Sequence, residues 1–220
     1  MKKRIALILT GTMLMGFVLS ACGDNESTEK KDEKTENSVE TSSNANNRTT
    51  FTVGFDAEYP PYGYMDENGE YTGFDLELAE AVCKLEGWEL VKKPINWDAK
   101  DMELNSGAID CIWNGFTMNG REDEYTFSTP YVDNSQVIVV AENSGINTPE
   151  DLAGKTVGVQ AASAALELLQ SDEKDGQKAL ADTFGALNEF ADYNTAFTEL
   201  QAGALDALAI DIGVANYQIK

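Results

Sequence analysis

After residue 50, the chain contains short apolar runs, some alternating with polar residues, and longer segments in which apolar residues recur on one side of a helical period. The first pattern predicts β-strands and the second predicts amphipathic helices. Strands are expected at 51–55, 90–95, 108–113, 136–141, 156–160, 186–190 and 206–210. Helices are expected at 75–86, 98–106, 163–170, 195–202 and 212–217, with a helical turn at 149–153. Strands that alternate with helices indicate an α/β protein with one or two mostly parallel sheets.

The helix expected at 75–86 has signals at both ends. Asp75 is a favourable N-cap residue, and Gly87 can adopt the left-handed conformation that ends many helices. The apolar residues between them predict one buried face. The expected members of this face are Leu76, Ala79, Val82, Cys83 and Leu85.

The first 22 residues are typical of an export signal. Three basic residues at 2–4 precede an apolar run at 5–19, which is shorter than the roughly 20 residues that span a bilayer. The run ends in Leu19-Ser20-Ala21-Cys22, which resembles a bacterial lipobox. This resemblance implies that Cys22 carries acyl chains, so that the protein is anchored to the membrane without spanning it. The alternative is an ordinary signal peptide with an incidental cysteine.

Residues 23–50 are polar, and Val39 is the one large apolar side chain among them. Such a segment cannot bury enough surface to offset the loss of chain entropy on folding. We therefore expect a disordered tether between the membrane and the folded part.

Charge and composition exclude several functions. The formal net charge is −22, and the sequence contains no histidine. A strongly acidic surface repels phosphate backbones, so we expect no nucleic-acid partner. Catalytic triads and zinc sites that need histidine are impossible. We expect neither a metal nor a cofactor.

Two cysteines, Cys83 and Cys111, follow the tether. An exported protein can join such a pair in a disulfide. Both lie in apolar stretches, which favours buried thiols over the disulfide.

Four polar residues come directly after predicted strands. In parallel sheets, ligands bind beyond the carboxyl ends of the strands. The strand ends therefore predict a binding site that includes Asp56, Asn114, Gln160 and Asp211.

Residues near these strand ends could recognise the two charges of a free amino acid. Arg121, the single arginine after residue 50, could hold a carboxylate together with backbone amides near Ser163. Asp211 could hold the ammonium group, and Tyr59 with Phe74 could form an aromatic wall. Each candidate also has a simpler interpretation. Arg121 could form a surface ion pair with Glu122, Asp123 or Glu124, and Ser163 or Asp211 could cap a helix. Tyr59 and Phe74 could be core residues, and Asp56 and Glu58 could be solvated loop acids.

Seven short motifs occur in a fixed order between residues 51 and 217. They are Tyr59-Pro60-Pro61-Tyr62, Gly73-Phe74-Asp75-Leu76-Glu77-Leu78-Ala79, Ser106-Gly107-Ala108-Ile109-Asp110, Trp113-Asn114-Gly115-Phe116-Thr117 followed by Arg121, Phe127-Ser128-Thr129-Pro130-Tyr131, Asp151-Leu152-Ala153-Gly154-Lys155-Thr156-Val157-Gly158-Val159-Gln160, and Asp206-Ala207-Leu208-Ala209-Ile210-Asp211. The ordered set resembles the solute-binding proteins of polar amino-acid ABC transporters, which are bacterial extracellular solute-binding proteins of family 3 with the type 2 periplasmic-binding-protein fold.

The resemblance implies two α/β lobes with a ligand cleft between them, lobe 1 at 51–138 and lobe 2 at 139–220. Family members usually continue beyond the position of Lys220, so the chain is expected to be truncated at its C-terminus and its second lobe to be incomplete. Many members also have glycine where this chain has Ala162. A left-handed turn at an alanine would be strained.

The resemblance also assigns a role to each candidate by position. Arg121 would clamp the ligand carboxylate with the amides of Ser163 and Ala164. Asp211 would bind the ammonium group with the carbonyl of Gly115 and the hydroxyl of Thr117. The other positions would complete the cleft: Tyr59 and Phe74 as aromatic walls, Asn114 and Gln160 as polar positions, and Asp56 and Glu58 at the end that selects the ligand side chain.

The implied protein is a monomeric lipoprotein, exported and anchored to the outer face of the cytoplasmic membrane. It would capture a free polar amino acid, whose identity the sequence leaves open, and deliver it to the permease of an ABC importer. On this interpretation it is not an enzyme. The alternative is an enzyme similar to the cyclohexadienyl dehydratases on the same fold, with Glu58 as the acid in the cleft.

Overall fold

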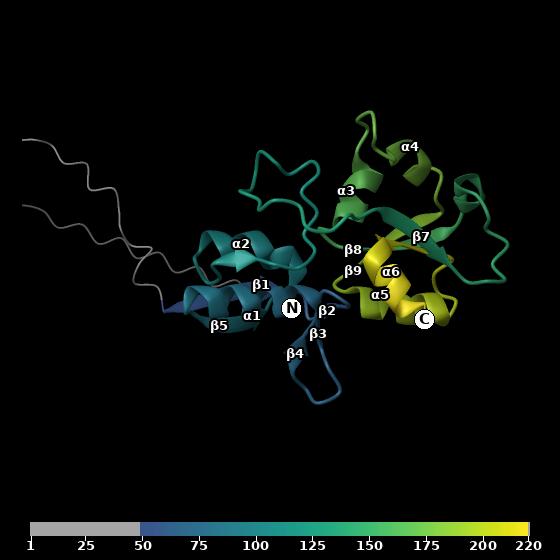
Figure 1. The fold of residues 1–220 in the computed structure, drawn as a ribbon. Coiled ribbons are helices and arrows are strands. Elements are labelled where there is room, and N and C mark those ends of the chain that lie inside the picture. Colours follow the sequence, from purple (N-terminus) through teal and green to yellow (C-terminus); the bar gives the residue numbers. More distant parts are fainter. Residues whose placement is uncertain (1–48, 220) are drawn as a thin grey trace, which may run out of the picture. The chain divides into compact units, whose positions relative to one another are not determined.

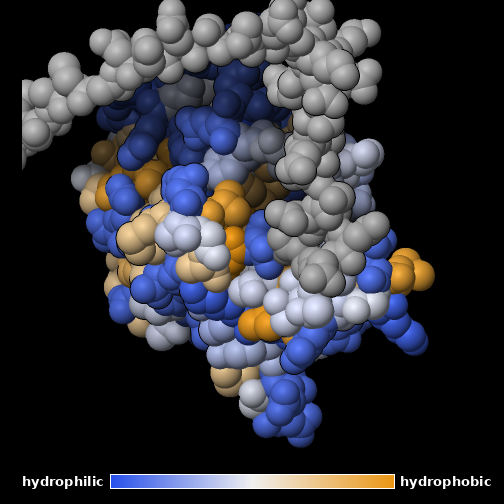
Figure 2. Space-filling model, turned by 90° about the vertical axis from the view of Figure 1, so that its left-hand side faces the viewer, coloured by the Kyte–Doolittle hydropathy of each residue, from blue (hydrophilic) through white to orange (hydrophobic). Residues whose placement is uncertain are grey.

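The computed structural model describes residues 49–219. The predicted signal segment at 1–22, the predicted lipidation site Cys22 and residues 23–48 of the predicted tether lie outside the described residues. The predicted end of the tether at residue 50 is wrong, because Thr50 already pairs in the first strand. Within 49–219, no helix is both long enough and apolar enough to cross a membrane. The face of the molecule in Figure 2 is largely hydrophilic, and its apolar side chains form small separate patches.

The first sheet has three parallel strands in the order β5-β1-β6. Figure 1 labels β5 and β1 of this sheet beside α1. The strands are β1 (Thr50–Phe55), β5 (Glu89–Pro94) and β6 (Cys111–Ile112), and the connecting helical segments are α1 (Phe74–Glu86), η2 (Trp97–Ala99) and α2 (Lys100–Asn105). Val53 and Phe55 of β1 pack against Leu76 and Ala79 of α1, and all four are buried. This core fixes the carboxyl end of β1, where Asp56 follows.

A small antiparallel sheet is inserted between β1 and α1. Its strands are β2 (Glu58–Tyr59), β3 (Gly63–Met65) and β4 (Tyr71–Thr72). Prolines 60 and 61 separate β2 from β3, because proline cannot donate a hydrogen bond to a strand ladder. The insertion carries Tyr59 and Tyr62, which are both buried.

The second sheet has four strands in the order β7-β10-β8-β9. The strands are β7 (Gln136–Val140), β8 (Thr156–Gln160), β9 (Ala186–Phe190) and β10 (Ala207–Asp211). The helices around them are η3 (Pro149–Leu152), α3 (Ala164–Gln170), α4 (Lys178–Ala181), α5 (Tyr193–Gln201) and α6 (Ile212–Gln218). Strand β7 runs antiparallel to β10, and the other pairs are parallel. Every residue of β10 is buried, as expected of a central strand that is covered on both faces.

The start of α1 differs from the prediction. Gly73, with φ of 130°, is the N-cap residue, and Asp75 lies inside the helix. The Asp75 carboxylate instead accepts hydrogen bonds from the Gly115 amide and from the Tyr131 hydroxyl, at 2.9 Å for Tyr131. The predicted apolar face is also too wide, since Val82 is exposed and Leu85 is 84% exposed. The segment 113–135 supplies the partners that draw Asp75 away from a capping role.

Three further elements differ from the prediction. The strand expected at 108–113 is reduced to β6, because Asp110 turns back so that its carboxylate accepts the Thr52 N–H at 2.7 Å. Helix α5 begins at Tyr193, since Asp192 caps it by accepting the Thr195 N–H at 2.7 Å. The short helix α4 had no predicted counterpart. The other predicted strands and helices agree with the structure to within about one turn.

Cys83 is buried and not in a disulfide, which excludes a Cys83–Cys111 bond and confirms the expected buried thiol at Cys83. Burial raises the pKa of the Cys83 thiol. Cys111 lies half-buried on β6. Cys83 therefore acts as an apolar core residue of α1.

One apolar cluster joins the small antiparallel sheet to the second sheet. Tyr59 and Tyr62 stack with ring centroids 5.5 Å apart, and Tyr59 lies 5.9 Å from the ring of Tyr193. The other buried members come from the second sheet and its helices: Ala196, Phe197, Leu200, Leu205, Leu208, Ile210, Val214 and Ala215. The simpler interpretation of Tyr59 as a core residue is thus correct, although Tyr59 also borders the cavity described below.

Candidate functional site

Most of the predicted site residues surround one small cavity of about 20 Å³. Nine of them line it, namely Tyr59, Asn114, Gly115, Thr117, Arg121, Gln160, Ser163, Ala164 and Asp211. Trp97 and Phe116, which were not among the predicted site residues, complete the wall. A volume of this size holds about one water molecule, so the cavity as it stands is smaller than an amino acid.

Arg121 is held in the segment 113–135, which has neither helix nor strand. Its side chain is only 4% exposed, and its guanidinium lies 4.8 Å from the ring centroid of Phe116. Nη1 donates to the carbonyl of Thr117 at 3.1 Å. Nε and Nη2 both donate to Oε1 of Glu167, at 3.2 and 2.6 Å. The expected alternative of a surface ion pair with a neighbouring acid is therefore wrong, because the partner of Arg121 comes from α3.

Asp211 lies at the carboxyl end of β10 and is 3% exposed. Its backbone is the N-cap of α6, but its side chain makes no capping hydrogen bond. Oδ1 instead accepts a hydrogen bond from Gln136 Nε2 at 2.7 Å and another from Asn134 Nδ2. Gln136 stands opposite Asp211 in the β7–β10 register. The simpler interpretation of Asp211 as a side-chain cap of α6 is therefore wrong, because the strand pairing places Gln136 where it can bind the Asp211 carboxylate.

Oxygen acceptors gather around Asp211. Thr117 Oγ1 accepts from Asn134 Nδ2 at 3.1 Å, which links the Arg121 segment to Asp211 through one amide. The amide oxygens of Asn114, Asn134 and Gln136 are buried and accept no hydrogen bond from any residue of the described range 49–219. Buried acceptors without donors carry a free-energy cost that a cationic ligand with several N–H groups can relieve. Asn134 and Gln136 carry no local sequence signal for this role: the β7–β10 pairing brings Gln136 to Asp211, and Asn134 lies two residues before β7.

Gln160 connects the ends of β8 and β1. Its Nε2 donates to Asp56 Oδ2 at 2.6 Å and to the carbonyl of Ala191 at 3.1 Å. Asp56 Oδ1 accepts the Glu58 N–H at 2.9 Å, and the carboxyl group is 5% exposed. Burial raises the pKa of Asp56 to about 6, although the hydrogen bonds from Glu58 and Gln160 oppose the rise. Asp56 is therefore a buried carboxyl group rather than a solvated loop acid.

Glu58 and Phe74 lie away from the cavity. Glu58 is exposed and accepts a hydrogen bond from Asn194 Nδ2. Phe74 is 44% exposed, and its ring centroid is 6.2 Å from that of Tyr131. The aromatic wall of the cavity is formed by Tyr59 together with Trp97 and Phe116, whose rings meet edge to face at 5.4 Å.

The turn before α3 contributes backbone and Ser163 to the cavity. Ser163 Oγ accepts the Leu166 N–H at 3.2 Å, so the expected capping role is confirmed. Ala162 has φ of 53°, so this non-glycine residue adopts the left-handed conformation that is strained for an alanine. Its carbonyl accepts a hydrogen bond from Lys100 Nζ at 3.3 Å. Lys100 is 4% exposed and lies over the Trp97 ring; burial lowers its pKa.

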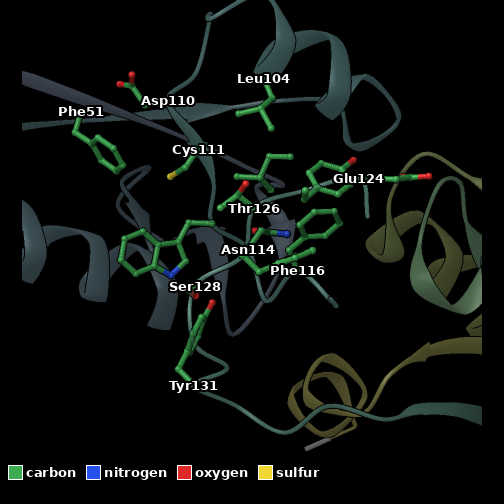
Figure 3. Close-up of a pocket in the computed structure, with 14 residues that line it drawn as sticks. Phe51, Leu104, Asp110, Cys111, Asn114, Phe116, Glu124, Thr126, Ser128 and Tyr131 are labelled. Carbon is green, nitrogen blue, oxygen red and sulfur yellow. The ribbon is translucent and has the colours of Figure 1, made fainter. Parts of the chain in front are cut away.

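A larger cavity of about 530 Å³ lies beside β6 (Figure 3). Most of its wall is aromatic or aliphatic, and it shares Asn114 and Phe116 with the small cavity. Its charged lining residues, Asp110 and Glu124, are both acidic and stand at opposite rims in Figure 3. This cavity therefore offers no cation for a carboxylate. Paired opposite charges occur at the small cavity, and within the described range no group of three or more Cys, Asp and Glu residues is arranged to hold a metal ion.

The chain is similar to known amino-acid-binding proteins. L-cystine-binding protein TcyJ from Escherichia coli K12 is 33% identical over 167 residues, which are 74% of this chain and 59% of TcyJ. The chain thus spans less than two thirds of the length of this curated relative. A substrate-binding protein of an ABC uptake transporter from Streptococcus pneumoniae, solved with bound histidine, superimposes with a TM-score of 0.73 at 36% identity, covering 77% of this chain and 69% of that one.

A third likeness concerns the alternative function. An ancestral amino-acid-binding protein, described as a precursor of cyclohexadienyl dehydratase, superimposes with a TM-score of 0.70 at 31% identity, over 77% of this chain and 73% of that one. These structural matches confirm the predicted α/β fold of two-lobed amino-acid-binding proteins. The sequence model of the bacterial extracellular solute-binding proteins, family 3, matches residues 51–211. The chain therefore belongs to the bacterial extracellular solute-binding proteins of family 3.

Proposed function

We propose that this protein binds a free amino acid between two lobes, 51–138 and 139–220, and delivers it to an ABC importer. One observation carries the proposal: a buried guanidinium, Arg121, and a buried carboxylate, Asp211, line the same cavity. A free amino acid presents the two complementary charges on one carbon atom. Membership of a solute-binding family supports the proposed binding of an amino acid.

The carboxylate of the ligand would meet Arg121 in a bidentate contact, which is the strongest geometry for such a pair. Backbone amides at Ser163 and Ala164 would add further donors. The ammonium group would meet Asp211, the Gly115 carbonyl, the Thr117 hydroxyl and Asn114. The buried amide oxygen of Asn114 supports this role, since it accepts no hydrogen bond within the described part of the chain.

The side chain of the ligand would extend along Tyr59, Trp97 and Phe116 toward Asp56 and Gln160. Glu58 and Asp192 lie close enough to Asp56 to raise its pKa further, so this end of the site is acidic. An acidic end favours a cationic or amide side chain. Direct ligand contacts by Glu58 and Phe74 stay a prediction, because both lie outside the cavity in this structure.

Ligand entry needs an opening of the cleft, since the present cavity of about 20 Å³ is too small for an amino acid. Closure around a ligand then requires that the ligand bind the closed form more tightly than the open form. Contacts made from both lobes, such as Arg121 on one side and Asp211 on the other, supply this difference.

We further propose that the protein is exported and held at the outer face of the cytoplasmic membrane by acyl chains on Cys22. The extracellular character of the family supports export. The lipobox-like sequence at 19–22 supports the anchor. A monomer is the proposed working form, with the permease of the importer as its partner and no nucleic acid or cofactor.

Isothermal titration calorimetry with the twenty common amino acids, cystine and ornithine tests the proposal. The wild-type protein should bind at least one of them, and Arg121→Ala should abolish this binding because the carboxylate loses its cation. Lys178→Ala, which removes an exposed positive charge from α4, is the matched control and should bind as the wild type does. An unchanged dissociation constant in Arg121→Ala would contradict the proposed site.

The second candidate is a dehydratase, favoured by the likeness to the ancestral precursor. Its expected acid, Glu58, is exposed and hydrogen-bonded to Asn194 outside the cavity, which weakens this alternative. Incubation with prephenate or arogenate separates the two, since turnover would favour the enzyme and its absence the binding protein.

A further inference from the structure

We infer that Glu167 is an internal competitor for the ligand carboxylate, which holds Arg121 in the ligand-free protein and lowers the affinity for the amino acid. The inference rests on the proposed function. Glu167 lies on α3 and Arg121 in the segment 113–135, so the ion pair joins two parts of the site that are 46 positions apart in the sequence.

The guanidinium edge that faces Glu167 is the edge suited to a carboxylate. Nε and Nη2 point to Oε1 of Glu167 at 3.2 and 2.6 Å, while Nη1 is engaged by the carbonyl of Thr117. An incoming carboxylate that binds this edge in a bidentate manner must therefore displace Glu167. The two carboxylates cannot occupy the same edge together.

Exposure of the two side chains is very unequal. The Arg121 side chain is 4% exposed, whereas the Glu167 side chain is 50% exposed. A buried guanidinium without a partner is strongly unfavourable, so Arg121 keeps a carboxylate until another replaces it. Glu167 can return to water at little cost, because its carboxylate is already half solvated. The structure thus has a carboxylate that is needed in the absence of the ligand and is easily released in its presence.

The exchange sets the affinity for the ligand. Displacement of Glu167 frees the Nε–Nη2 edge of Arg121, a residue of the cavity wall, for the α-carboxylate. Since the ion pair is made only without ligand, it stabilises the ligand-free state alone and reduces the apparent affinity by its own equilibrium constant.

Glu167→Gln tests this inference by removing the competing charge with little change in shape. Titration calorimetry with L-arginine, L-histidine and L-cystine should show a dissociation constant roughly two- to fivefold lower than in the wild type, the range expected for a half-exposed ion pair. Glu173→Gln, an exposed change of the same charge on the same lobe, should leave the constant unchanged.

A second measurement separates competition from a general structural role. Glu167→Gln should lower the thermal midpoint of the ligand-free protein but not that of the protein saturated with the same amino acid, because the ion pair is already broken in the complex. If the wild type binds an amino acid and Glu167→Gln binds it with equal or weaker affinity, the inference is overturned and the proposed function stands. Absence of binding by both proteins would overturn the proposed function, and the inference with it.

Discussion

Replacing Asp75 by asparagine should stabilise the protein near neutral pH and not in acid. Asp75 is fully buried, and the described partners of its carboxylate are the Gly115 amide and the Tyr131 hydroxyl, neither of which carries a positive charge. Burial raises its pKa from 3.8 to about 6, and the hydrogen bonds from Tyr131 and Gly115 oppose the rise. Keeping this group ionised in the folded protein is therefore costly.

The sign and size of the effect follow from proton linkage. Between about pH 4 and pH 6 the folded protein holds a proton on Asp75 that the unfolded chain has lost, so stability falls as pH rises through this window. A shift from 3.8 to about 6 corresponds to about 3 kcal/mol of unfolding free energy above pH 6. Asparagine does not carry this ionisation cost. It replaces one acceptor oxygen by a donor, however, and the lost hydrogen bond lowers the unfolding free energy by about 1 kcal/mol.

Urea unfolding of the wild type and Asp75→Asn, at several values between about pH 4 and pH 7.5, measures the difference directly. The variant should be more stable by about 1–2 kcal/mol at the upper end and less stable by about 1 kcal/mol at the lower end. Asp172→Asn, which removes one exposed carboxylate, corrects for the change in net charge. A stability difference that does not vary with pH would refute the reasoning.

Two other substitutions give sharp expectations. Ala162→Gly should raise the unfolding free energy by about 0.5–1 kcal/mol in urea titrations, because glycine accepts φ of 53° without the Cβ clash and this gain exceeds the added chain entropy. Ala165→Gly, within α3, is its control and should lose stability, and a loss at Ala162 as well would contradict the strain argument. Asp211→Asn should weaken amino-acid binding by about 2–4 kcal/mol in calorimetry, since the ammonium group loses its counter-charge. A dissociation constant within about twofold of wild type would remove the ammonium role.

The sequence predicted the elements of the second sheet well because their signals are local. Strand β8 and helix α3 were predicted closely, since β-branched residues at 156, 157 and 159 and a serine cap at Ser163 favour them without reference to the rest of the chain. Asp75 shows the limit of such signals. An aspartate before an apolar helical segment favours an N-cap, but the Asp75 carboxylate instead accepts a hydrogen bond from the distant Gly115 amide.

The candidate site was predicted in part for the same physical reason. The strand ends and the family resemblance predicted twelve site residues, and nine of them line one cavity in the structure. Glu167, Asn134 and Gln136 were missed, because an acid within a helix and two amides near a strand are unremarkable until the chain is folded. The β7–β10 register is the signal that could have found Gln136 opposite Asp211.

The two charged ends of the site are built on supports of different stiffness. Asp211 and Gln136 are opposite residues of paired strands, whereas Arg121 belongs to a stretch of 113–135 that has no regular structure. Insertions and substitutions in that stretch can reshape the carboxylate end while the strand ladder keeps the ammonium end in place. Descendants of such a scaffold could therefore change which ligands they hold, and how tightly, by editing one loop and preserving one fixed anchoring point.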